Sequence, residues 1–281
     1  MEFTKLQGSG NDFIVIDNRE GIVNQLIKKL HLTMKDFVLR LCRPHTGIGA
    51  DGLILIEPPK DPENHFSWQF FNADGSVAEM CGNGSRCAVR FAYEKGIVDG
   101  EVRFETLAGV IRAWITEGGK RVKVQLTKPY GYRDVVLEVE GRKIEGSFIN
   151  TGVPHFVSLA EDIENIDVKK LGRAIRFHRE FEPKGTNVNF IKPVSPKGII
   201  IRTYERGVEG ETLACGTGAT ASAIVAHIKG LVREKPVEVY TKGGELLRID
   251  FDEAYQEVFL EGGVCKVFEG FITEEALLCM S

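Results

Sequence analysis

Alternating hydrophobic and polar residues predict that most of this chain is β-structure with few helices. Helical spacing appears at 86–96 and 219–230, and each of these stretches ends in Lys-Gly, a common helix terminus. Weaker helical patterns at 24–42 (one or two helices) and 162–178 predict peripheral helices. The expected strands, rich in β-branched and aromatic residues, cover 12–18, 52–58, 65–72, 101–107, 110–116 and 121–127.

The second half of the sequence repeats the first. MCGNGSRCAVRFAYEKGIV at 80–98 aligns without a gap on ACGTGATASAIVAHIKGLV at 214–232, and the flanking strands follow in the same order. Two unrelated units that share a glycine pattern would not match over so long a run. We therefore interpret the chain as an internal duplication. The expected fold class is α+β, with two pseudo-symmetric lobes, each a mostly antiparallel, barrel-like curved sheet around a central helix.

The expected lobes differ slightly in how they enclose their helices. The second helix, 216–229, is apolar nearly all round, as a helix surrounded by a sheet should be. The first, 83–95, carries Arg86 and Arg90 and is expected to be less enclosed. We place the N-terminal lobe at 1–126, completed by a returning segment at 263–281, and the C-terminal lobe at 127–262.

Composition and charge exclude some classes of binding partner. The formal net charge is −4 and no block of like charge occurs, so neither nucleic acid nor an anionic membrane is an expected partner. The start lacks the layout of a signal peptide, and no apolar run approaches the roughly 18 residues of a membrane span. We expect a cytoplasmic protein. Its cysteines show no CxxC pair and no zinc spacing with histidine, so no metal site is expected.

The candidate chemistry lies at two equivalent cysteines. Cys81 and Cys215 each precede a Gly-x-Gly turn that opens a central helix. The unpaired N–H groups of a helix start bind anions and favour a thiolate, and glycines let a ligand approach the backbone. A single cysteine before such a turn is more often structural. Its recurrence at the equivalent place favours two bases, each beside a carboxylate-binding turn.

Two such units facing each other across an inter-domain cleft could invert a stereocentre. One thiolate would remove the α-proton of a bound amino acid, and the opposing thiol would return a proton to the other face. Cys87 has no counterpart, because Ala221 holds the equivalent place, so we expect a buried helix residue and not a disulfide partner of Cys81. The remaining cysteines carry no functional signal: Cys42, Cys265 and Cys279.

These features resemble the diaminopimelate epimerase family, the cofactor-independent isomerases of lysine biosynthesis. The resemblance covers essentially the whole chain through KLQGSGNDFIVID, GIGADG, FNADGS, CGNGSRC, GTNVNFI, YERGVEGETLACGTGA and FEGFI, in family order. It implies an acid/base pair, Cys81 and Cys215, assisted by His155 and Glu205. It also implies a diaminopimelate substrate, no cofactor, no metal and a homodimer. The substrate-binding residues that it implies are Asn11, Asn72, Gly82, Asn83, Asn187, Glu205, Arg206, Gly216 and Thr217.

The residue chemistry agrees with that assignment, although each residue alone has a simpler interpretation. Arg206 suits a distant second carboxylate, and Glu205 with nearby amide oxygens suits an ammonium group. Alone, this pair could be a solvated surface ion pair. The asparagines could serve turn geometry, and His155 could be a packing residue.

Two positions depart from the common family pattern. Val153 stands in GVPH, where the family often has GNPH, and Gly52 stands where some members have Gln. Each departure removes one possible side-chain contact to substrate, so they bear on substrate stringency.

Three other functions remain open from the sequence. A racemase of the proline or hydroxyproline type would share the helix starts but needs no distal Arg206 and Glu205. A dithiol redox protein would cycle a Cys81–Cys215 disulfide. A cysteine nucleophile for acyl transfer would leave the second, symmetric thiol without a role.

Overall fold

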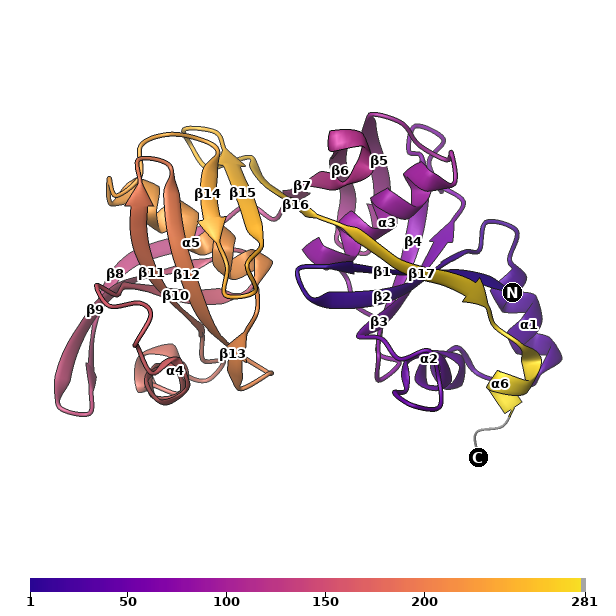
Figure 1. Ribbon diagram of the computed structural model, residues 1–281, viewed down its shortest axis with the longest axis horizontal. Coiled ribbons are helices and arrows are strands. Elements are labelled where there is room, and N and C mark those ends of the chain that lie inside the picture. Colours follow the sequence, from indigo (N-terminus) through magenta and orange to yellow (C-terminus); the bar gives the residue numbers. More distant parts are fainter. Residues whose placement is uncertain (279–281) are drawn as a thin grey trace. The chain divides into compact units, whose positions relative to one another are not determined.

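The computed structural model describes residues 1–278 and divides into two compact units (Figure 1). Unit 1 comprises Met1–Val124 together with the C-terminal segment that begins at Gly263. Unit 2 comprises Gln125–Gly262. The chain therefore leaves unit 1 within one strand and re-enters it at the end of another. Among the described residues, no helix combines the length and the apolar character needed to cross a membrane.

Unit 1 is built on a sheet in the order β17-β1-β2-β3-β4-β5-β6-β7. Neighbours are antiparallel except in the β2–β3 and β4–β5 pairs, which are parallel. The strands are β1 (Glu2–Gly8), β2 (Asn11–Asp17), β3 (Gly52–Glu57), β4 (Phe66–Asn72), β5 (Glu101–Thr106), β6 (Gly109–Thr116), β7 (Arg121–Leu126) and β17 (Cys265–Phe271).

Unit 2 repeats this topology in the order β8-β9-β10-β11-β12-β14-β15-β16. The parallel pairs, β10–β11 and β12–β14, fall at the same two places. The predicted duplication and the α+β class are thus confirmed. The strands are β8 (Tyr130–Val139), β9 (Arg142–Asn150), β10 (Pro154–Leu159), β11 (Asn187–Ser195), β12 (Gly198–Glu205), β13 (Gly210–Thr212, paired with β12), β14 (Val237–Tyr240), β15 (Leu246–Phe251) and β16 (Val258–Gly263).

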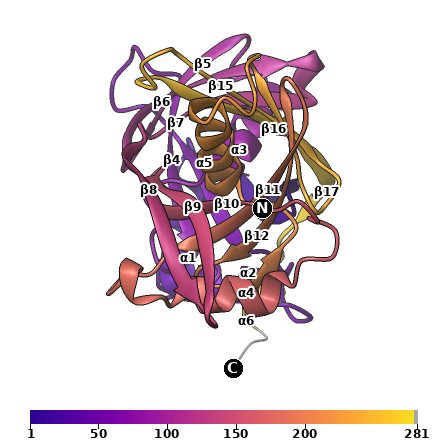
Figure 2. The same ribbon diagram turned by 90° about the vertical axis from the view of Figure 1, so that its left-hand side faces the viewer.

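Each sheet packs against one central helix. Helix α3 (Gly82–Glu94) contacts β1, β2, β3 and β6, and α5 (Gly216–Ile228) contacts strands from β9 to β15. Figure 2 shows α5 with β10 and β11 beside it. Both are followed by the predicted glycine in the left-handed region, Gly96 and Gly230. The expectation that the first helix would be less enclosed is wrong, because Arg86 is fully buried within unit 1. Polar partners for its guanidinium make that burial possible.

Short helices cover the other face of each sheet. They are α1 (Ile22–Lys29), α2 (Met34–Cys42), α4 (Val168–Arg176) and α6 (Glu274–Leu278). Two 3-10 turns lie elsewhere in the order of elements: η1 (Glu117–Gly119) joins β6 to β7, and η2 (Arg179–Phe181) follows α4. The 24–42 stretch forms two helices, the second with a capping box between Thr33 and Asp36. The predicted helix at 162–178 begins only at Val168, because the Asp167 side chain caps it by accepting from the backbone N–H of Lys170 at 2.9 Å.

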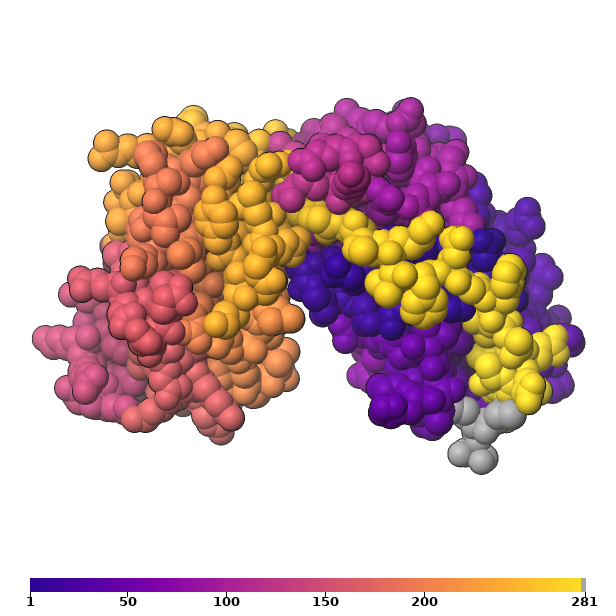
Figure 3. All heavy atoms as spheres, viewed as in Figure 1, coloured from indigo at the N-terminus to yellow at the C-terminus, as the bar shows by residue number. Residues whose placement is uncertain are grey.

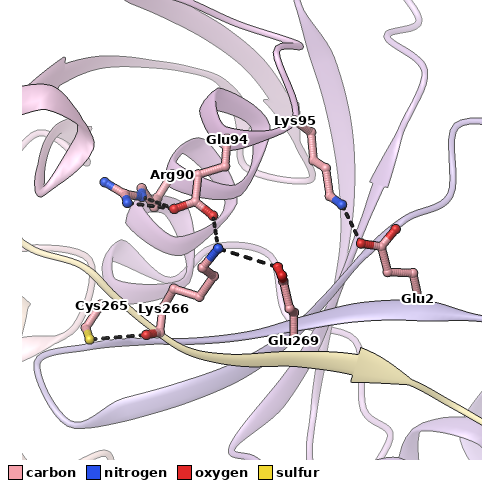
Figure 4. Close-up of polar contacts among 7 residues, drawn as sticks. All are labelled: Glu2, Arg90, Glu94, Lys95, Cys265, Lys266 and Glu269. Atoms are coloured by element: carbon pink, nitrogen blue, oxygen red, sulfur yellow. Dashed lines mark hydrogen bonds and ion pairs between the residues drawn. The ribbon is translucent and has the colours of Figure 1, made fainter.

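The C-terminal segment is part of unit 1. Strand β17 pairs antiparallel with β1, and Figure 3 shows this segment (yellow) lying beside the N-terminal strands (indigo) on the surface. An ion pair joins it to the end of α3, where Lys266 lies 3.3 Å from Glu94, and a second pair joins α3 to β1, where Lys95 lies 2.7 Å from Glu2 (Figure 4). Cys279 lies outside the described residues.

Candidate active site

Cys81 is the N-cap residue of α3. Its backbone is extended, with φ −147° and ψ 121°, and its Sγ accepts a hydrogen bond from the backbone N–H of Gly84 at 3.4 Å. Gly82 is the first helical residue, and Cys81 itself stays partly exposed. The local geometry therefore directs a helix-start N–H group at the thiol, which favours its anionic form. Cys87, as predicted, is a fully buried residue inside α3.

A chain of hydrogen bonds orders the residues around this helix start. Asn83 donates through Nδ2 to Oδ1 of Asn11 at 2.7 Å, and Asn11 donates to Oδ2 of Asp51 at 3.0 Å. Arg86 Nη2 donates to Oδ1 of Asn83 at 2.6 Å and to Oγ of Ser9, also at 2.6 Å. The buried guanidinium thereby fixes the orientation of the Asn83 amide. We call Asn11, Cys81, Gly82, Asn83 and Arg86 the first cluster.

The other expected site residue of unit 1, Asn72, ends β4. Its Nδ2 donates to Oγ of Ser76 at 3.0 Å, so Asn72 has a hydrogen-bond partner within its own turn. Gly52 lies on the neighbouring strand. A Cβ there would come within 2.6 Å of the Phe71 carbonyl oxygen. This strand pair therefore has no room for a side chain at Gly52.

Cys215 occupies the equivalent N-cap of α5, with φ −131° and ψ 111°. Its Sγ lies 3.5 Å from Oγ1 of Thr217, and Gly216 is the first helical residue. Thr151 Oγ1 donates to the Thr217 carbonyl oxygen at 3.0 Å and so ties β9 to this turn. Burial, together with the negative charge of Glu205, raises the pKa of Cys215 to about 12. The raised pKa favours the protonated thiol at Cys215.

Asn187 and Arg206 are brought together at the ends of β11 and β12. Asn187 Oδ1 accepts from the backbone N–H of Arg206 at 2.8 Å, while its Nδ2 donates to the Pro154 carbonyl oxygen at 2.9 Å. The Arg206 Nη1 donates to the carbonyl oxygen of Lys184 at 3.2 Å. Asn187 is buried, so its two hydrogen bonds hold the backbone of Arg206 in a fixed place.

Two ionisable side chains of unit 2 have shifted pKa values. Burial, followed by the positive charge of Arg206, lowers the pKa of His155 from 6.5 to about 3. Burial raises the pKa of the half-buried Glu205. We call this group of unit 2 the second cluster. Its members are His155, Asn187, Glu205, Arg206, Cys215, Gly216 and Thr217.

Sequence reasoning missed the polar residues that lie behind the expected ones. Arg86 supports the first cluster, and Asn189 and Thr203 contact His155 directly or through one another. A signal for the latter two existed, because both occupy inward-facing positions of otherwise apolar strands. Among the described residues, no group of three or more His, Cys, Asp or Glu side chains could hold a metal ion.

The family model for diaminopimelate epimerase matches residues 3–131 and 147–267. This chain belongs to the diaminopimelate epimerase family. The family member from Aquifex aeolicus (strain VF5) is 64% identical over 277 residues, with 99% of each chain covered. The diaminopimelate epimerase of Hydrogenobaculum sp. (strain Y04AAS1) is 55% identical over 278 residues, covering 98% of this chain and 99% of its own.

Solved structures of more distant proteins share the fold. A probable proline racemase from Agrobacterium radiobacter K84 superposes with a TM-score of 0.66 at 16% identity, covering 98% of this chain and 95% of that chain. A phenazine biosynthesis protein of the PhzF family from Bacillus anthracis superposes with a TM-score of 0.68 at 13% identity, covering 97% and 99%. At these identities the likeness shows the fold alone.

Proposed function

We propose that this protein interconverts LL-2,6-diaminopimelate and meso-diaminopimelate in lysine biosynthesis. The observation that carries the proposal is the pair of cysteines at equivalent N-cap positions of the two central helices, Cys81 on α3 and Cys215 on α5. Membership of the diaminopimelate epimerase family supports the choice of substrate. The two thiols supply both proton transfers, so the reaction needs neither pyridoxal phosphate nor a metal ion.

The reaction begins with a thiolate at one helix start. The substrate carboxylate accepts hydrogen bonds from the first N–H groups of the helices, at Gly82 and Asn83 and at Gly216 and Thr217. The thiolate takes the α-proton, and the electron pair of the broken C–H bond moves into the carboxylate, where those donors stabilise the added charge. The thiol of the other cysteine then gives its proton to the opposite face of the planar carbon. The configuration is inverted, and the two cysteines have exchanged protonation states.

The pKa of Cys215 assigns the first roles. Since burial and Glu205 raise that pKa to about 12, Cys215 enters the first turnover as the proton donor. Cys81, whose Sγ already accepts a helix-start N–H, enters as the base. In the reverse direction the roles are exchanged, so Cys215 has to lose its proton in its turn. A substrate ammonium group close to Glu205 would offset the negative charge that opposes this loss.

The distal end of the substrate would be recognised by the remaining polar residues. The Arg206 guanidinium has five donors and suits the distal carboxylate, and the raised pKa of Glu205 is consistent with a site that awaits a cation. We assign Asn11, Asn72 and Asn187 to the remaining amine and carboxylate contacts. Val153 and Gly52 offer no amide to these contacts, so the remaining residues must supply the stringency.

We further propose that the enzyme works as a homodimer in the cytoplasm, where a reducing environment keeps both cysteines as thiols. Oxidation of the pair would remove the base and the acid together, so activity should depend on reductant. The mass in solution, measured by light scattering, tests the dimer: the mass of two chains supports it and the mass of one chain contradicts it.

Alanine substitution of each cysteine tests the catalytic assignment. Cys81→Ala and Cys215→Ala should each abolish epimerisation, because the remaining thiol has no partner to complete the inversion. Cys265→Ala is the matched control, since Cys265 is exposed on β17 and should leave turnover unchanged. Full turnover by Cys81→Ala would contradict the proposal. The proline-type racemase is not favoured, because the probable proline racemase named above shares only the fold, and the redox protein is not favoured, because the chain belongs to the diaminopimelate epimerase family.

A further inference from the structure

Unit 2 contains a buried polar triad on the face of its sheet that packs against α5. The triad consists of His155 on β10, Asn189 on β11 and Thr203 on β12, with exposed fractions of 0%, 0% and 3%. Strand alternation places His155 and Asn189 on the same face as Val157 and Ile191, two residues further along, which belong to the core around α5. Polar groups in such a place need a function or a structural reason, because their burial is costly.

Unit 1 shows that the fold itself does not require this triad. In the strand ladders, Phe13 pairs with Gly52 as His155 pairs with Asn187, so Phe13 and His155 hold equivalent places. The same register sets Ile54 and Phe70 at the places of Asn189 and Thr203. Phe13 and Phe70 pack edge to face with ring centroids 5.8 Å apart. The same face of the sheet is thus apolar in unit 1 and hydrogen-bonded in unit 2.

The hydrogen bonds of the triad determine which nitrogen of His155 carries the proton. Asn189 Nδ2 lies 3.1 Å from His155 Nδ1 and 3.3 Å from the carbonyl oxygen of Phe156, which can only accept. The amide nitrogen must therefore occupy this side, and the Thr203 hydroxyl donates to Oδ1 on the other side at 3.0 Å. Since Asn189 Nδ2 is a donor, His155 Nδ1 is an acceptor. The neutral ring then carries its proton on Nε2.

The triad lies against the first turn of α5, and its last donor is unused. A Cβ at Gly218 would come within 2.5 Å of Asn189 Oδ1 and 3.3 Å of Cys215 Sγ, so the triad and the cysteine border the same small volume. His155 Nε2 is buried and has no hydrogen-bond partner in the part of the chain that the structure describes. A buried N–H without an acceptor destabilises the resting protein, and an anion at the α5 start would relieve that cost.

We propose that Asn189 and Thr203 are positioning residues that hold His155 as the Nε2–H tautomer, a neutral hydrogen-bond donor reserved for an anion at the second cluster. The inference rests on the proposed function for what that anion is used for. His155 then donates a hydrogen bond but takes no proton from the substrate at Nδ1. Because unit 1 has Phe13, Ile54 and Phe70 at the equivalent places, the two proton-transfer sites are chemically unequal although their helix starts are equivalent.

The tautomer can be read directly by NMR on the full-length protein labelled with ¹⁵N-histidine. A two-bond ¹H–¹⁵N correlation spectrum at neutral pH, with the His155 signal assigned by its loss in His155→Gln, should show a protonated Nε2 and an unprotonated Nδ1. Thr203→Val replaces the hydroxyl by a methyl group and removes the hydrogen bond that orients the Asn189 amide. The amide can then rotate, and the His155 tautomer with its proton on Nδ1 should appear as well. The kcat should fall about 10-fold, the amount that one hydrogen bond of ordinary net strength supplies, with KM changed less than about twofold. Thr203→Ser should restore both readouts.

Thr220→Val is the matched control, because Thr220 is equally buried and donates to its own helix, to the Gly216 carbonyl oxygen at 2.8 Å. It loses the same hydroxyl and should change neither the tautomer nor kcat by more than about twofold. A protonated Nδ1 in the unmodified protein would overturn the proposal, as would equal activity of Thr203→Val and Thr203→Ser. The tautomer is read without substrate, so a protein that shows it but does not turn over diaminopimelate would refute the proposed function separately.

Discussion

The neutrality of His155 predicts an acid-sensitive term in the free energy of unfolding. Burial lowers the pKa of His155 to about 3, whereas an unfolded histidine titrates near 6.5. Below about pH 6.5, His155 binds a proton in the unfolded chain but stays neutral in the folded chain. The free energy of unfolding that this difference contributes is therefore complete at high pH and decreases as the pH falls. Linkage gives a loss of about 2.7 kcal/mol between about pH 8 and about pH 4.5.

The variant His155→Gln isolates this term, because glutamine does not titrate and every other group contributes equally to both proteins. Urea unfolding followed by circular dichroism at several pH values should show the stability gap between the two proteins shrink by about 2.7 kcal/mol toward about pH 4.5. Fluorescence is the internal control, since Trp68 and Trp114 lie in unit 1 and His155 in unit 2. A gap that stays constant within about 0.5 kcal/mol would refute the claim that His155 is held neutral by burial.

Two further predictions use matched positions inside the chain. Gly218→Ala should destabilise the protein by about 1–3 kcal/mol, because its Cβ would lie 2.5 Å from the Asn189 side-chain oxygen. At the equivalent Gly84, a Cβ meets nothing nearer than 3.4 Å, so Gly84→Ala should cost less than about 1 kcal/mol; equal costs in denaturant melts would refute this packing argument. Arg86→Met should destabilise the protein by about 3 kcal/mol or more, because the buried oxygens that accept from Arg86 would lose their donor, whereas Arg90→Met should change stability by only about 0.5 kcal/mol. Similar melting curves for the two arginine variants would contradict the positioning role of Arg86.

The duplication and both cysteine positions could be predicted because they depend on local sequence signals. A Gly-x-Gly helix start after cysteine, a helix ending in Lys-Gly and strands such as Phe13–Ile16 are recognisable in isolation. The repeat at 80–98 and 214–232 then identifies the cysteines as equivalent. The register of each strand pair could not be predicted to the residue, since it depends on contacts distant in the sequence.

The hairpin of β8 and β9 was not predicted, for a physical reason. In β8, inward Val135 and Leu137 alternate with outward Asp134, Val136 and Glu138, and the break before Tyr130 suggested the end of the strand pattern. Its turn places Glu140 and Gly141 at positive φ, 50° and 74°, which suits a tight hairpin. The signal was present but weaker than that of the buried strands.

Buried polar side chains were the least predictable part of the candidate site. Arg86, Asn189 and Thr203 are polar, and polar residues ordinarily face solvent, so the alternation that places Asn189 and Thr203 inward was not decisive by itself. Only the folded chain supplies the oxygens that accept from Arg86 and the carbonyl of Phe156 that orients Asn189. For the same reason the sequence overstated the length of the helix before Arg176, where a local cap at Asp167 sets the start.

Exchange of the substrate α-proton with solvent tests the central claim most directly. Reduced protein would be incubated in D₂O with LL-diaminopimelate and, separately, with proline and with lysine, and the α-proton signal followed by NMR. The account predicts that the signal disappears and the meso isomer forms for diaminopimelate only, and that Cys81→Ala shows no epimerisation. Exchange on proline instead would contradict the assigned substrate, and no exchange on any of the three, with both thiols verified as reduced, would contradict the two-thiol mechanism.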